Sequence, residues 1–444
     1  MLLLNVLGKC TLAKTNRIAR QIRFGHNNNN YNIKNLRNSR IFTSLHFSTL
    51  EKNDSSSSKH KAPARFFDSR EKYLVFCTTT SEKWRVGERV ISELDELNPS
   101  PPSINIFDAG LGDAAVLTRV LRGAHGRFPS VPILAVAKEI SLEDVRQSLI
   151  KLPDRFSEHP QTVLAVTNMT YKAAPGLQPL TKKGKEDLTW IEMPLKGTSA
   201  IDFERQIEEQ IRILEDKQVW DVRHSADGNP LPAKPCVIVI YREDQRFTLD
   251  NVLPQASGGL GQSNSELVYD LSIASQPFRS RASAESKCKN VLMPLVASLK
   301  PEGRLVVVQS TGHDPGMEIV RNAWPDEEPF KTPGHILQAE MLKQIQDGPN
   351  KQNLKSSDFI FSDGDQFRYE LHSLPDDATD SIGTSVLLAA WNAATYVAQV
   401  DTNRSDELVL NGRFQDCVND VLQKYGRLWF TNEAFVVSKK KLDF

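Results

Sequence analysis

The sequence predicts an α/β protein in which a mostly parallel sheet is covered by helices on both faces. Short apolar runs typical of buried strands recur along the chain, and segments with the apolar spacing of amphipathic helices separate them. A glycine turn follows the first strand of the main domain. The length of 444 residues is sufficient for one large domain with insertions or for two modest domains.

The first fifty residues have an unusual charge. They contain eight Lys and Arg residues and no acidic residue, whereas the whole chain is balanced at 55 Lys+Arg and 55 Asp+Glu. An Arg-rich, acid-free segment with an apolar start is typical of an organelle transit peptide. Residues 40–44 also resemble a mitochondrial processing site. We therefore expect residues 1–60 to be a transit peptide and linker directing the protein to the mitochondrial matrix, with the plastid as the alternative. A disordered basic tail and a basic arm for nucleic acid are the other interpretations.

A helical extension is expected over residues 61–102. Its apolar spacing predicts an amphipathic helix over residues 67–97, which Thr78–Thr80 could divide in two. The proline-rich run 98–102 ends this helix and begins the main domain.

The main domain, residues 103–440, alternates strands with helices. The expected strands are residues 103–108, 132–137, 162–166, 236–241, 267–274, 304–310 and 428–438. The expected helices include one that ends near residue 122, followed by 142–152, 201–220, 284–299, 382–400 and 414–425.

Residues 172–234 differ in character and are interpreted as an insertion or lid. The basic cluster around Lys182 and the acidic residues of the following helix leave two interpretations, an RNA-contacting flap or a solvated lid.

Composition excludes several classes of protein. No stretch approaches the roughly 20 uncharged apolar residues of a membrane-spanning helix. The five cysteines contain no Cys-x-x-Cys pair and the nine histidines no His-x-x-x-His pair. The sequence therefore argues against a disulfide scaffold and a metal site, and we expect reduced, intracellular thiols.

The turn after the first strand carries the strongest chemical signal. Gly110 and Gly112 allow a tight turn and the close approach of a ligand to the next helix. The same glycines also satisfy a dinucleotide-binding pattern. Asp108 distinguishes the two interpretations, because its carboxylate would repel a diphosphate and suits a cationic ligand. S-adenosylmethionine, with its sulfonium and amino groups, is such a ligand.

With Asp108, Gly110 and Gly112 in this order, the sequence resembles the class I S-adenosylmethionine-dependent methyltransferases. The resemblance implies a Rossmann-like, seven-stranded methyltransferase sheet, mostly parallel with the last strand reversed. It also implies S-adenosyl-L-methionine as the cofactor and places these three residues and Asp113 beside it.

The next two strand exits extend the resemblance. Glu139 follows the second strand and would accept both ribose hydroxyls, although a surface Lys-Glu pair is the alternative. Asn168 and Met169 follow the third strand, where the family places an adenine contact, and a plain turn would also fit.

Later segments match the family in order. The run 266–275 resembles its fourth strand, and 299–308 resembles its Leu-Lys/Arg-Pro-Gly-Gly turn into the fifth, with Glu302 in place of glycine. The terminal helix and strand, up to residue 437, suit the reversed last strand. The resemblance covers about residues 103–440, interrupted by the insertion.

The acceptor side gives weaker signals. Ser275–Phe278 partly resembles the motif of amino-group methyltransferases, in which a side-chain oxygen binds the amine and an aromatic ring stacks on it. Ser275 and Phe278 would take these roles, but Gln276 replaces a proline, and a structural corner is the alternative. We also expect Arg279 and Arg281 to bind an anionic substrate or to be solvated. His313, after the fifth strand, is the candidate general base, with a structural histidine as the alternative.

The sequence thus predicts an organellar methyltransferase whose acceptor is unidentified, with an amino group as one candidate. A non-catalytic methyltransferase fold that acts in assembly or RNA binding is the first alternative. An NAD(P)-dependent oxidoreductase is the second. Protein, RNA and small molecules all remain open as the acceptor, and so does the oligomeric state.

Overall fold

The computed structural model describes residues 70–216, 218–224, 230–254, 267–347, 354–372 and 383–441. Internal contacts divide the chain into residues 1–61 and 62–444, and every described residue belongs to the second unit. The expected transit peptide and linker lie outside the described residues. Among the helices described, none is both long and apolar enough to cross a membrane.

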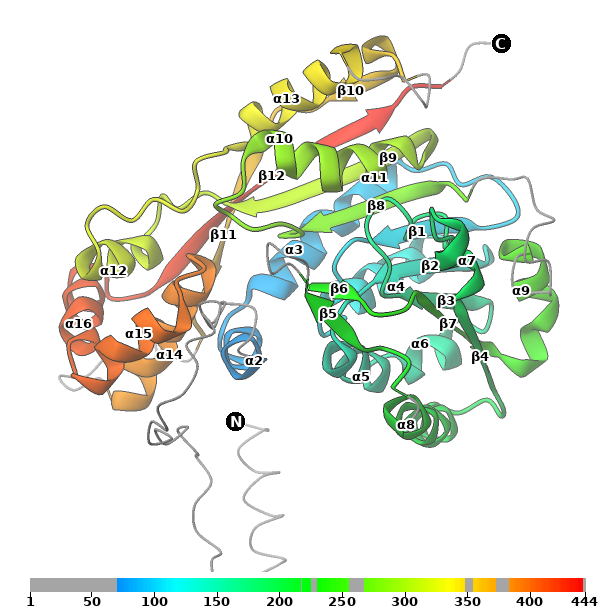
Figure 1. Cartoon of the computed structure of the whole chain (residues 1–444), viewed down its shortest axis with the longest axis horizontal. Coiled ribbons are helices and arrows are strands. Elements are labelled where there is room, and N and C mark those ends of the chain that lie inside the picture. The colour runs from blue at the N-terminus through cyan, green and yellow to red at the C-terminus, as the bar shows by residue number, and fades with distance from the viewer. Residues whose placement is uncertain are drawn as a thin grey trace, which may run out of the picture. The chain divides into compact units, whose positions relative to one another are not determined.

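A ten-stranded sheet forms the centre of the described unit (Figure 1). Its order is β10-β12-β9-β8-β1-β2-β3-β7-β4, and β11 also pairs with β12. The strands are β1 (Ile104–Asp108), β2 (Ile133–Lys138), β3 (Thr162–Thr167), β4 (Thr189–Leu195), β7 (Cys236–Arg242), β8 (Tyr269–Ser275), β9 (Leu299–Ser310), β10 (Phe359–Phe361), β11 (Asp365–Glu370) and β12 (Trp429–Lys439). A separate pair consists of β5 (Val222–His224) and β6 (Pro230–Pro232).

The pairing of these strands confirms the predicted α/β class with a mostly parallel sheet, but the described sheet has ten strands where the resemblance implied seven. β3, β2, β1, β8 and β9 are joined by parallel pairs, and β12 runs antiparallel to β9. The sheet also has two strands beyond β3: β7 pairs antiparallel with β3, and β4 pairs parallel with β7. β4 belongs to the segment interpreted as an insertion, so part of that segment is an edge strand.

Helices cover both faces of the sheet because successive strand residues point to opposite sides. On β1, Ile104 and Ile106 join one core and Phe107 joins the other. The first core is closed by α3 (Glu82–Ile91), α4 (Ala115–Arg127), α5 (Leu142–Ile150), α6 (Pro153–Glu158) and α8 (Ala200–Asp216). The second is closed by α9 (Arg246–Val252), α11 (Met293–Ala297) and α13 (Gly334–Asp347).

The expected helix 284–299 contains an irregular turn. α10 (Ala284–Lys287) is followed by a π-helical turn over Cys288–Leu292 and then by α11. Pro294 lies at the start of α11 and has no N–H to donate to the preceding turn, which favours such a departure from regular α-helix. Lys287, the last residue of α10, therefore lies directly before this π-helical turn.

A third core joins the two ends of the described chain. It contains residues of α2 (Arg70–Thr79), α12 (Pro315–Ala323), α14 (Thr384–Val397), α15 (Thr402–Leu410) and α16 (Phe414–Tyr425), which we call the helical cap. Figure 1 shows these helices gathered beside one end of β12. Lys72 of α2 pairs with Asp406 at 2.7 Å, and Asn392 of α14 donates to the Lys72 carbonyl at 3.0 Å. The expected division of the N-terminal helix is confirmed, because α2 ends at Thr79 and α3 begins at Glu82.

Candidate cofactor and acceptor site

Asp108 lies at the exit of β1 with its side chain buried. Oδ1 accepts a hydrogen bond from the Gly110 N–H at 3.1 Å. Oδ2 is buried and receives no hydrogen bond from any residue that the structure describes. Burial raises the pKa of Asp108 to about 6, although the Gly110 N–H and the charge of Lys83 act in the opposite direction. Oδ2 of this carboxylate therefore lacks a hydrogen-bond donor from the described protein, and the charge of Lys83 offsets only part of the cost of burial.

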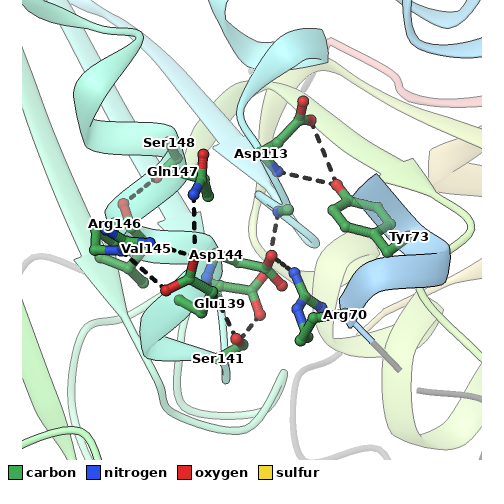
Figure 2. Close-up of polar contacts among 12 residues, drawn as sticks. Arg70, Tyr73, Asp113, Glu139, Ser141, Asp144, Val145, Arg146, Gln147 and Ser148 are labelled. Atoms are coloured by element: carbon green, nitrogen blue, oxygen red, sulfur yellow. Dashed lines mark hydrogen bonds and ion pairs between the residues drawn. The ribbon is translucent and has the colours of Figure 1, made fainter. Parts of the chain in front are cut away.

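The glycine turn that follows is closed by a tyrosine from the helical cap. Gly112 has a φ of +52°, and a Cβ atom at this position would lie 2.3 Å from the Tyr73 hydroxyl. That hydroxyl accepts from the Asp113 N–H at 3.0 Å and lies 3.4 Å from Asp113 Oδ1 (Figure 2). Glycine is thus required both by the left-handed backbone and by the close approach of α2.

Glu139 connects the exits of β1 and β2. Its Oε1 accepts from the N–H groups of Ile140 and Ser141 at 2.7 and 2.9 Å. Its Oε2 accepts from the Gly112 N–H at 2.9 Å (Figure 2). Each carboxylate oxygen can accept two hydrogen bonds, so Oε2 retains capacity for a ligand hydroxyl. Asp108 and Glu139 therefore both accept hydrogen bonds from N–H groups of the same glycine turn.

Asp113 is used for anchoring within the protein. It pairs with Lys151 at 2.5 Å. Burial alone would raise the pKa of Asp113, but the hydrogen bond from Lys151 and the charge of Lys83 lower it below its usual value. Arg70 of α2 pairs with Asp144 at the start of α5 (Figure 2). Helix α2 is therefore tied to both strand exits.

Asn168 and Met169, which were expected at the adenine, follow the end of β3. Asn168 donates to the Lys234 carbonyl at 2.9 Å and accepts from the Cys236 N–H at 2.8 Å, so its amide holds β3 to β7. Met169 is buried in the second core. Both side chains are thus held by contacts within the protein, and their expected contact with adenine stays a prediction.

Tyr171 is a residue at this edge that sequence reasoning missed. Its hydroxyl donates to the Pro277 carbonyl at 2.9 Å, and the ammonium of Lys138 lies 4.8 Å from its ring centroid. Burial raises the pKa of Tyr171, and the nearby charges of Glu139 and Asp108 raise it further. It therefore links the β3 exit to the β8 exit as a neutral phenol. An aromatic residue on an irregular loop gives no sequence signal for such a role.

A cavity of about 310 Å³ lies at the exits of β8 and β9. Phe278 and His313 both line it, which brings these two candidate residues together. Ser275 Oγ is buried without a hydrogen-bond partner in the described part of the chain. Gln276 adopts a φ of +50°, a conformation closed to proline, so the backbone here differs from the Pro-Pro motif that the sequence partly resembles.

Of the two arginines expected to bind an anionic substrate, Arg281 is engaged by groups of the protein itself. Arg281 pairs with Glu327 and donates to the carbonyls of Ala398 and Gln399 at 2.7 and 2.9 Å. It therefore ties the loop to the end of α14. Arg279 is half-buried, and its expected contact with substrate remains a prediction.

His313 is held at the rim of the cavity by its neighbours. Asp314 caps α12 by accepting from the Met317 N–H at 2.9 Å and also accepts from the Thr431 N–H at 2.9 Å. His313 itself is exposed. The loop position is therefore well defined, while the role of this histidine as a base stays a prediction. No cluster of three or more metal-ligating side chains occurs among the described residues.

Comparisons with known proteins give matches among solved structures. No protein-family model and no curated protein sequence matches the chain. Among solved structures, a Listeria monocytogenes protein assigned to the class I S-adenosylmethionine-dependent methyltransferases matches 81% of this chain at 9% identity and a TM-score of 0.29. This chain spans 60% of that protein.

Two further structures are similar in the same way. The cyclopropane synthase MmaA2 of Mycobacterium tuberculosis matches at 10% identity over 85% of this chain and 90% of its own, with a TM-score of 0.30. The plantazolicin methyltransferase BpumL, solved with S-adenosylhomocysteine, matches at 8% identity over 84% of this chain and 93% of its own, with a TM-score of 0.30. The strand order and pairing define the fold of this chain as a Rossmann-like, mostly parallel sheet in which β12 runs antiparallel to β9.

Proposed function

We propose that this protein is an S-adenosylmethionine-dependent methyltransferase. The observation that carries the proposal is the unpartnered Oδ2 of Asp108, buried beside the glycine turn. A buried carboxylate oxygen without a partner is costly, and a cationic donor compensates that cost. A sulfonium cofactor with an α-amino group supplies such charge, whereas a diphosphate would add negative charge beside Asp108 and Glu139.

The residues fit the different parts of such a cofactor. Asp108 would bind the amino group, and Gly110, which has open space around its Cα, would permit a close approach of the ligand. Glu139 would bind the ribose through the remaining capacity of Oε2. The glycine turn precedes α4, so the cofactor would lie at the start of that helix.

The chemistry of this class needs positioning more than a particular catalytic side chain. When bound, the cofactor supplies a methyl group on a positively charged sulfur. If the acceptor is an amine, its nitrogen lone pair forms the new N–C bond, the S–C bond breaks, and one proton leaves the nitrogen for solvent or a nearby base. Holding the reacting groups in line is worth roughly 7–11 kcal/mol at best. An acceptor bound in the cavity beside β8 would lie at the same sheet edge as Asp108, because β1 and β8 are paired neighbours.

Calorimetric titration distinguishes this proposal from its rivals. We expect S-adenosylmethionine to bind the full chain with a dissociation constant of about 1–100 µM, in the range of ordinary enzyme ligands, and NADH and NADPH to give no heat. Binding of a nicotinamide nucleotide alone would identify an oxidoreductase. Binding of neither ligand would favour a non-catalytic factor.

We also propose that residues 1–60 direct the protein to the mitochondrial matrix. Their basic, acid-free composition supports this proposal, because a membrane potential that is negative inside draws cationic segments inward. A fluorescent protein fused behind these residues should accumulate in mitochondria. Replacing the Arg residues at 17, 20 and 23 by Gln should leave it diffuse. A plastid signal, or a diffuse signal from the unaltered fusion, would contradict the mitochondrial address.

A further inference from the structure

The cavity at the β8 and β9 exits contains a buried ammonium. Lys287 is 2% exposed and lines the cavity. Its Nζ donates to the Ser280 carbonyl at 2.9 Å and to Thr332 Oγ1 at 2.5 Å, and lies 4.7 Å from the Phe278 ring centroid. Both hydrogen-bond partners are neutral, and within the described ranges no carboxylate approaches this nitrogen within the 4.0 Å of an ion pair. The ammonium therefore has no direct ion-pair partner among the described residues.

The energetics of this position favour an anionic ligand. Burial lowers the pKa of Lys287 to about 8, although the charge of Glu433 and that of Cys288 act to raise it. A carboxylate bound in the cavity would raise the pKa of Lys287 again, because an opposite charge nearby stabilises the ammonium. An uncompensated buried charge is rarely retained for stability alone.

A carboxylate lines the same cavity. Glu433 of β12 accepts on Oε1 from Gln309 Nε2 at 2.8 Å and from the Gly334 N–H at 2.7 Å. Its Oε2 accepts no hydrogen bond from the described part of the chain, although the residue lines the cavity. Glu433 and Lys287 do not form an ion pair with each other. The cavity thus presents one positive and one negative group that are both available to a ligand.

We propose that the methyl acceptor is a small zwitterion, an amino-carboxylate whose carboxylate pairs with Lys287 and whose ammonium pairs with Glu433. Before transfer, the ammonium would lose one proton to Glu433 or to solvent, and the freed nitrogen lone pair would form the N–C bond as the S–C bond breaks. The proposal rests on the proposed methyltransferase function, which places the acceptor in this cavity. The volume of about 310 Å³ is at the lower end of the range for small-molecule pockets and suits a molecule of amino-acid size. Phe278 and Phe330 provide apolar walls for a side chain.

The test compares matched molecules on the full chain. The twenty α-amino acids are offered with a methyl-labelled donor, and each acceptor found is compared with the amine that lacks its carboxylate and the acid that lacks its amino group. For phenylalanine these are phenethylamine and 3-phenylpropionate. We expect transfer to at least one amino acid, and binding of each singly charged analogue at least tenfold weaker. Equal binding of an analogue, or transfer to none of the twenty, overturns the inference.

Two variants assign the charges separately. Lys287→Met should raise the KM for the amino acid about 10- to 100-fold, as expected for the loss of a charged hydrogen bond, and should leave binding of the amine unchanged. Glu433→Gln should weaken binding of the amine and leave binding of the acid unchanged. Lys289→Met is the matched control, since this exposed lysine follows two residues later. An equal effect of Lys287→Met on amine and amino acid would show a merely structural lysine and contradict the proposal.

Cofactor titration separates this inference from the proposed function. A variant that binds S-adenosylmethionine like the unaltered protein is folded and has an intact cofactor site. If the unaltered protein binds no S-adenosylmethionine, the proposed function fails, whatever the amino acids do. If it binds the cofactor but binds no amino acid more tightly than its singly charged analogues, only the inference about the acceptor fails.

Discussion

Replacing Asp108 by asparagine should weaken S-adenosylmethionine binding about 10- to 100-fold and should also stabilise the free protein. The loss of affinity follows from the removal of a charge-assisted hydrogen bond to the cofactor. The gain in stability follows from the burial of this carboxyl and its unpartnered Oδ2, because an amide carries no charge that needs solvation. Calorimetric titration and urea denaturation of both proteins measure the two effects.

The stabilising effect should depend on pH in a defined direction. The pKa of Asp108 is raised to about 6 in the folded protein, so between about pH 4 and 6 the unfolded chain binds fewer protons than the folded one. The free energy of unfolding contributed by this residue therefore falls as the pH rises through that window and stays low above it. The advantage of Asp108→Asn should be negligible near pH 4 and reach about 1–3 kcal/mol at pH 7.

The affinity of the unaltered protein should follow the same ionisation. Below about pH 6 the free Asp108 becomes protonated, so binding of a cation should weaken by up to about tenfold per pH unit. The control is Asp95→Asn, because Asp95 is exposed and its pairing with Arg127 at 3.2 Å is worth little. An Asp108→Asn protein that binds the cofactor normally, or that is less stable at pH 7, would contradict the assignment of this site.

Replacing Gly112 by alanine should destabilise the protein by about 2–4 kcal/mol, and Tyr73→Phe should restore part of that loss. Alanine must adopt a left-handed conformation, which costs about 1–2 kcal/mol, and its Cβ would lie 2.3 Å from the Tyr73 hydroxyl. Without that hydroxyl, the nearest atom is Tyr73 Cζ at 3.4 Å, an ordinary contact. Urea denaturation of both single variants and the double variant measures the coupling.

Tyr73→Phe alone should cost about 1 kcal/mol, because the Asp113 N–H loses its acceptor. The double variant should therefore be about 1–2 kcal/mol more stable than the sum of the single changes predicts. Strictly additive effects would contradict the packing of α2 on the glycine turn. Gly110→Ala is the control, since no atom lies within 4 Å of a Cβ placed there.

The strands around the glycine turn could be predicted because they carry local signals. β2 and β3 contain continuous apolar runs, the apolar residues of β1 are separated by Asn105, and all three strands are buried on both faces, which is typical of central parallel strands. The reversed last strand followed from the resemblance. By contrast, β4 interrupts its apolar pattern with Glu192 and Pro194, and its pairing with β7 depends on contacts that no local pattern encodes.

The candidate cofactor residues carry a sequence signal for a related reason. Asp108, Gly110, Gly112 and Glu139 follow strand ends, and parallel strands bring their carboxyl ends to one edge. The acceptor side was harder to predict. Lys287 and Glu433 come from a helix and from the antiparallel strand β12, and only tertiary packing places them in one cavity.

Some contacts that the sequence could not reveal are made by α2, a helix of the N-terminal extension. Tyr73 lies 39 residues before Gly112, in a helix that the sequence predicts only as amphipathic. For Arg281, by contrast, the sequence suggested a contact, but the structure shows other partners. An arginine beside the expected substrate loop suggests anion binding, but the carbonyls at the end of α14 and Glu327 satisfy it instead.

A crystal structure of the full chain grown with S-adenosylhomocysteine and NADH together tests the central claim most directly. The account predicts the thioether nucleoside at the glycine turn, with its amino group on Asp108 Oδ2 and its ribose on Glu139. A nicotinamide dinucleotide lying there instead, with its diphosphate over Gly110 and Gly112, would contradict it.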